Sequence, residues 1–94
     1  MIIAACTLEL HLPDAASLKD KRSLVKSLLA RLHNTFNVAA AEVDHLDLWQ
    51  SSVIGLAVVS NSSPHAQQMI TTILDWIETH YPNVFIVRHD TRLV

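Results

Sequence analysis

The sequence predicts an α+β fold in which two helices lie on one face of a four-stranded antiparallel sheet. Apolar residues alternate over positions 2–12, and in two later segments they recur every three or four residues. Turn-forming residues separate these segments from two further apolar stretches. The predicted order of elements is therefore β-α-β-β-α-β.

The first strand is predicted from Ile2 to Leu12, with its even-numbered residues on the core side. Pro13 ends the strand because it lacks a backbone donor. A helix from Leu18 to about His33 follows, and Ser17 with Asp20 forms a start that resembles a capping box.

One face of this first helix is predicted to be buried, since its apolar residues recur at helical spacing. These residues are Leu18, Val25, Leu28, Leu29 and Leu32. The cations that lie off this face are expected to be in water: Lys19, Arg22, Lys26 and Arg31.

The middle of the chain is predicted to form two strands. The first runs from Val38 to Val43, residues 44–49 form a connection, and the second runs from Ser52 to Ser60. The second is almost continuously apolar, as expected of a central strand. Gly55 marks either a close backbone approach or a bulge.

A second helix is predicted with Ser63 as its cap and Pro64 in its first turn. Its apolar stripe consists of Met69, Ile70, Ile73, Leu74 and Ile77. The last strand is predicted from Asn83 to about Arg88. This order favours a ferredoxin-like split βαβ sandwich, formed as a single domain over residues 1–94.

Composition narrows the class of protein. The chain has 94 residues and a formal net charge of −2, which is a poor overall balance for a protein dedicated to nucleic acid. No apolar run approaches the roughly 18 residues of a membrane span, and no secretory signal is recognised. The single cysteine, Cys6, cannot form an internal disulfide. We expect a cytoplasmic protein without a membrane partner.

Charged residues gather in two segments. Five of the seven cations lie between Lys19 and Arg31, and an acidic stretch from Glu42 to Asp47 precedes Trp49. Together with Leu8 to Pro13, these segments resemble the YlxP-like family of small bacterial proteins. The resemblance implies the same sandwich fold. It also implies a role near the ribosome, because relatives are often encoded beside translation initiation and ribosome-maturation factors.

In the predicted topology, the end of the first strand, the start of the first helix and the turn between the middle strands share one end of the sheet. The candidate binding residues are therefore Lys19, Lys21, Arg22, Lys26, His11, Asp44, His45, Asp47 and Trp49. One reading of this edge is structural, with Asp44 or Asp47 paired to Lys21 or Arg22. The other is an anion site formed by the cations at the helix start.

A metal site and a catalytic site are two further possibilities at the same edge. Glu42, Asp44, His45 and Asp47 are possible hard ligands, but their spacing matches no recognised metal motif. One glycine in the chain excludes phosphate-binding glycine loops, and Ser17 near a histidine more commonly caps a helix. We therefore expect no metal, no cofactor and no catalytic residues.

The sequence thus predicts a binding protein without catalytic chemistry, with RNA or the ribosome as partner through the basic segment of the first helix. Base stacking on the open sheet face is not expected, because the first and third strands carry no aromatic residue. The alternative is a self-associating module that uses this apolar face to form a homodimer. A third possibility is a ligand or catalytic site at the Asp44–Trp49 edge.

Overall fold

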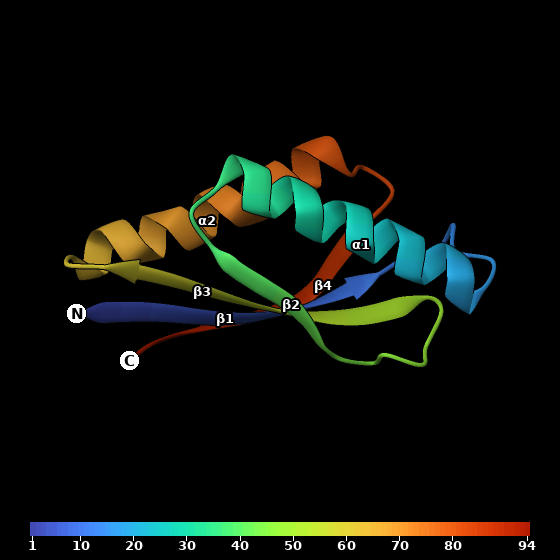
Figure 1. The fold of residues 1–94 in the computed structure, drawn as a ribbon, viewed down its shortest axis with the longest axis horizontal. Coiled ribbons are helices and arrows are strands. Elements are labelled where there is room, and N and C mark those ends of the chain that lie inside the picture. The colour runs from blue at the N-terminus through green and yellow to red at the C-terminus, as the bar shows by residue number, and fades with distance from the viewer.

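A computed structural model describes residues 1–94 and shows two helices packed on one face of a four-stranded sheet (Figure 1). The elements in chain order are β1 (Ile2–His11), α1 (Leu18–Thr35), β2 (Ala39–Asp44), β3 (Ser51–Ser60), α2 (Ser63–His80) and β4 (Phe85–Leu93). Neither helix is long and apolar enough to cross a membrane.

The sheet has the strand order β2-β3-β1-β4, and every neighbouring pair is antiparallel. β1 and β3 form the centre, with their register running from Ile2 opposite Ser60 to His11 opposite Ser51. Each helix connects two strands that have a third strand between them. The predicted split βαβ sandwich is confirmed.

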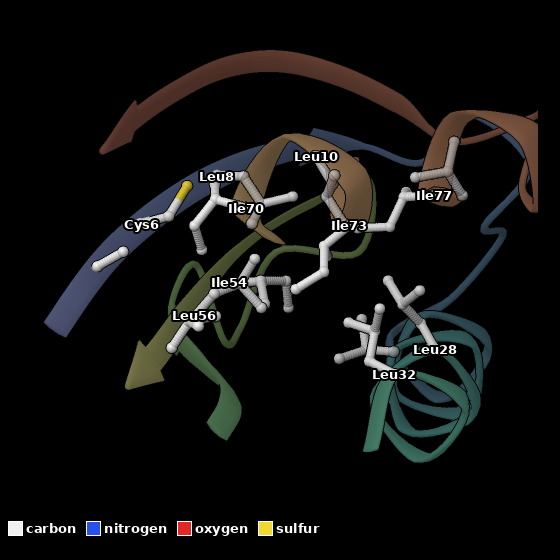
Figure 2. Packing of buried hydrophobic residues seen from close by; sticks show 14 of the residues in the cluster. Cys6, Leu8, Leu10, Leu28, Leu32, Ile54, Leu56, Ile70, Ile73 and Ile77 are labelled. Carbon is white, nitrogen blue, oxygen red and sulfur yellow. The ribbon is translucent and has the colours of Figure 1, made fainter. Parts of the chain in front are cut away.

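The core lies between the sheet and the helices (Figure 2). As predicted, the even-numbered residues of β1 from Ala4 to Leu10 are buried, and so are those of β3 from Ser52 to Val58. The helices contribute side chains at the expected spacing, among them Leu28 and Leu32 from α1 and Ile70, Ile73 and Ile77 from α2. The odd-numbered residues of both central strands face the open side of the sheet.

Several predicted boundaries differ by one or two residues from the structure; β1 ends at His11, β2 ends at Asp44 and β3 begins at Ser51. α1 continues to Thr35, because the amide of Phe36 still donates to the carbonyl of Leu32. α2 is capped by Ser62 instead of Ser63, and the Ser62 hydroxyl accepts from the amide of His65. β2 begins at Ala39.

β4 is longer than predicted and runs from Phe85 to Leu93. Its second half, residues 88–92, is polar and exposed, which is why no strand was predicted there. These residues pair with β1 through backbone groups, and β4 lies at the edge of the sheet. An edge strand with exposed side chains tolerates polar residues, so the pattern of apolar residues ends before the strand does.

Gly55 lies against the side chain of Val43 on β2, whereas the sequence analysis expected a close backbone approach or a bulge at this residue. The register of β2 against β3 shifts between Glu42 and Asp44, which leaves Val43 bulged over the open face. A Cβ atom at position 55 would lie 3.0 Å from Cγ1 of Val43. Because Gly55 has no side chain, there is room for the side chain of the bulged Val43.

This contact yields a prediction that a double-mutant cycle tests. We expect Gly55→Ala to lower the free energy of unfolding by about 1 kcal/mol, since the β-branched valine cannot easily move. In a Val43→Ala background the same change should be neutral or stabilising by up to about 1 kcal/mol, because alanine is favoured over glycine inside a strand. Urea unfolding measures both values, and an equal loss in the two backgrounds would contradict this account.

Candidate functional site

The segments that the sequence analysis expected to meet lie together at the end of the sheet opposite the two termini (Figure 1). Lys21 near the start of α1 contacts the β2–β3 turn, which comprises residues 45–50. Gln50 of the same turn contacts the loop between β1 and α1. The turn therefore joins two segments that are distant in sequence.

The side chain of Lys21, which the sequence analysis considered both as an ion-pair partner of the turn and as part of an anion site, is fully buried. Its ammonium donates to Oε2 of Glu42 at 2.6 Å, to the carbonyl of His45 at 2.9 Å and to the carbonyl of Leu46 at 3.2 Å. A lysine ammonium has three hydrogens, so its donors are all used. Lys21 is not accessible to a ligand.

Glu42 is the partner of Lys21, where the sequence analysis expected Asp44 or Asp47. Glu42 is paired opposite Ile54, and its side chain is 14% exposed. Its Oε2 atom also accepts a 2.6 Å hydrogen bond from the buried hydroxyl of Ser52 on β3. One carboxylate oxygen thereby connects α1, β2 and β3.

His45 adopts the only positive φ angle among the non-glycine residues, 58°. This left-handed conformation reverses the chain directly after β2, and the Asp44 carboxylate accepts a 2.8 Å hydrogen bond from the His45 amide. The imidazole Nδ1 and the Ser51 hydroxyl share a hydrogen bond of 2.7 Å. The side chains of Asp44, His45 and Ser51 thus fix the two ends of the turn.

Gln50 fixes the turn to the loop before α1. Its side-chain amide donates to the carbonyls of Pro13 and Ala15, each at 3.3 Å. Its backbone carbonyl accepts from the amide of Leu12 at 3.0 Å and lies 3.1 Å from Nδ1 of His11. His11 therefore contributes to the fixation of the turn.

The pair of Arg22 and Asp47, which the sequence analysis proposed, has a separation of 3.9 Å. The side chains are 62% and 93% exposed, so solvent and salt screen the interaction. This contact adds little to stability. It shows that the turn lies beside the exposed side of α1.

The exposed cations of α1 form two groups. Lys19, Arg22 and Lys26, with His33 further along, follow one side of the helix at spacings of three, four and seven residues; we call them the basic stripe. Arg31 points the other way, toward α2, with its guanidinium 5.0 Å from the ring centre of Trp76. The basic stripe consequently lies on the side of α1 away from α2.

Acidic side chains are sparse beside the basic stripe. Asp20 is the only acidic residue of α1, and it lies on another side of the helix, where its carboxylate accepts from the amide of Ala16. The Ser17 hydroxyl accepts from the amide of Asp20, so Ser17 is the cap that the sequence predicted. The basic stripe is therefore a positive surface on a chain of net charge −2, with Asp47 of the β2–β3 turn as the acidic side chain that contacts it.

Three groups bear on possible catalytic chemistry. Ser51 and His45 form a hydroxyl–imidazole pair, but no group hydrogen-bonds to the other ring nitrogen to orient the imidazole. No group of three or more histidine, cysteine or acidic side chains is arranged to hold a metal ion. Burial raises the pKa of the Cys6 thiol, which disfavours the reactive thiolate.

The open face of the sheet is a second surface of interest. A shallow depression of about 690 Å³ lies on it, and small residues dominate its lining, among them Ala5, Ala39, Ala41, Gly55 and Ala57. Val43 and Val59 are 53% and 62% exposed. Small apolar residues fill the middle of this face, Thr7, Asp90 and Arg92 also line the depression, and the two central strands carry no aromatic residue.

The chain is similar to proteins whose activity is unassigned. Residues 3–91 match the family described as "Protein of unknown function (DUF503)". The uncharacterized protein YlxP of Bacillus subtilis (strain 168) is 37% identical over 71 residues, which are 76% of either chain. A designed protein with a ferredoxin fold, solved by NMR, superposes with a TM-score of 0.64 over 98% of this chain and 86% of its own. At 16% identity, this likeness concerns the fold alone.

The buried ion pair leads to a stability prediction. We expect Lys21→Met to lower the free energy of unfolding by about 3–5 kcal/mol, because it leaves the Glu42 carboxylate and two turn carbonyls without their donor. The double variant Lys21→Met/Glu42→Leu should recover a large part of this loss, since no buried charge remains unpaired. Urea unfolding measures both. A loss below 1 kcal/mol for Lys21→Met would show that the pair does not hold the turn.

Proposed function

The chain belongs to the YlxP-like family of proteins of unknown function (DUF503), and we propose that it acts by binding RNA through the basic stripe of α1, without catalytic chemistry. The observation that carries this proposal is the segregation of Lys19, Arg22 and Lys26 on one exposed side of the helix. A dispersed set of cations on a weakly acidic protein would not favour a polyanion.

The dimensions of the basic stripe suit a short run of phosphates. Lys19 and Lys26 are seven residues apart, which is about 10 Å along a helix axis. A stacked nucleic-acid strand advances about 3.4 Å per nucleotide, so the stripe can contact about three phosphates. Binding of this kind is independent of base sequence and weakens strongly with salt. The ribosome, as an RNA-rich particle, is the partner that the proposal favours.

Charge reversal on the basic stripe tests this function. We expect Arg22→Glu/Lys26→Glu to weaken binding of single-stranded RNA at least about 10-fold at about 50 mM salt, with the logarithmic salt slope falling from about −2 toward zero. Fluorescence anisotropy with a labelled oligouridylate measures both quantities. Both residues are exposed, so the fold should be retained.

The matched control is Arg88→Glu/Arg92→Glu on β4, which changes the net charge equally but lies on another surface. It should leave the affinity within about twofold. Absence of binding by the unmodified protein would overturn the proposed function. Equal losses in the two double variants would also overturn it, because they would show a response to net charge only.

Self-association through the open sheet face is the second candidate function, favoured by the depression of small residues there. A second copy facing this depression could approach closely, because alanine and glycine side chains leave the backbone accessible. Since apolar contacts would dominate, the dimer should be insensitive to salt.

We therefore expect the sedimentation coefficient to rise with protein concentration and to be unaffected by added salt. Val59→Asp should abolish the rise, because it places a charge on the open face at a residue that is 62% exposed in the single chain. Sedimentation velocity measures this. A protein that stays monomeric at its solubility limit would contradict the second candidate.

A further inference from the structure

Trp49 in the β2–β3 turn differs from the other tryptophan in having no aromatic or cationic partner. Trp76 stacks on His80 with ring centres 4.5 Å apart, meets Phe36 edge-on at 5.9 Å, and lies beneath the guanidinium of Arg31. Trp49 is 52% exposed and has no aromatic or cationic side chain against its ring. Trp76 thus belongs to an aromatic cluster between the helices, whereas the Trp49 ring is half exposed outside any such cluster.

The exposure of Trp49 is imposed by a fixed turn. Lys21 holds the carbonyls of His45 and Leu46, and Gln50 is bonded to the loop before α1. A side chain with two rotatable bonds on such a backbone loses little conformational entropy when it binds. The turn therefore presents a large apolar ring on a backbone that is already fixed.

Trp49 lines an open space in a turn that contacts the basic stripe through Asp47. A shallow depression of about 420 Å³ is lined by Leu48, Trp49, Gln50 and Ser51. On the α1 side of the turn, Asp47 lies 3.9 Å from Arg22, which belongs to the basic stripe. The turn and the basic stripe are thus neighbouring parts of one surface.

We propose that Trp49 is a stacking platform for an unpaired RNA base, whose flanking phosphates contact Arg22 and Lys26. This inference rests on the proposed function and specifies its ligand as single-stranded RNA. An indole stacks on any base, but the bases of a duplex are already stacked and paired. The platform lies outside the sheet, so it does not require aromatic residues on the central strands.

Two carboxylates near the platform oppose an anionic ligand. Asp44 accepts a hydrogen bond from the amide of His45, which holds its carboxylate beside the turn. Asp47 competes directly for Arg22. RNA must displace this weak ion pair, and Asp47→Asn should accordingly tighten binding of any RNA by a few fold.

The closing experiment compares an oligouridylate with an RNA duplex of the same length, using the unmodified protein, Trp49→Leu, Trp49→Phe and Arg22→Glu/Lys26→Glu. We expect Trp49→Leu to weaken single-strand binding about 10-fold or more, Trp49→Phe to retain most of the affinity, and duplex binding to be unchanged in both. In a Trp76→Phe protein, the remaining tryptophan fluorescence should be quenched by the oligouridylate.

The outcomes separate this inference from the function on which it rests. If the protein binds both RNAs through the basic stripe while Trp49→Leu has no effect and the fluorescence is unchanged, the platform is overturned and the proposed function stands. An equal loss of single-strand and duplex binding in Trp49→Leu would overturn the platform too, because a base-stacking role predicts a selective loss. Failure to bind either RNA would overturn both.

Discussion

The ammonium of Lys21, buried and bonded to Glu42 and two turn carbonyls, is the constraint on which the functional end of this molecule depends. An unpaired charge at this depth would cost several kcal/mol, so the three acceptors must stay in place whenever the protein is folded. They come from β2 and from the turn that follows it. The position of the turn relative to α1 is therefore set by the core, although most of the turn's residues are exposed.

The Lys21 network connects the elements that carry the candidate binding residues. The basic stripe and Trp49 lie on elements that the Lys21 network joins, so the charges and the aromatic ring keep a constant relation to one another. Side chains that hold a surface in place need not touch what it binds. Lys21, His11 and His45 belong to this supporting group, whereas Lys19, Arg22, Lys26 and Trp49 remain free to contact a partner.

The fold could be predicted largely from periodicity, because β1, β3 and both helices have regular patterns of apolar residues. The spacing also contained a signal for Lys21, which is followed by Val25, Leu28 and Leu32 at intervals of four, three and four residues. Lysine is rarely buried, so the charge of Lys21 argued against placing it on the buried face despite its spacing. The bulge at Val43 and the left-handed His45 could not be foreseen, since tertiary contacts determine them and no glycine marks the turn. Because the bulge and the turn conformation position these carboxylates, the sequence could not show that Glu42, and not Asp44, is the partner of Lys21.

Hydrogen exchange at the amides of Leu12 and Leu48 tests the central claim most directly. The first donates to Gln50, so its bond breaks when the turn separates from the segment before α1. The second donates to the His45 carbonyl that also accepts from Lys21, so its bond reports whether the turn keeps its conformation. If the Lys21 network locks the turn to the core, their opening free energies should lie within about 1 kcal/mol of those of β3 amides such as Leu56. Fast exchange at these two amides, while the β3 amides stay protected, would show that the turn opens independently and would contradict this account.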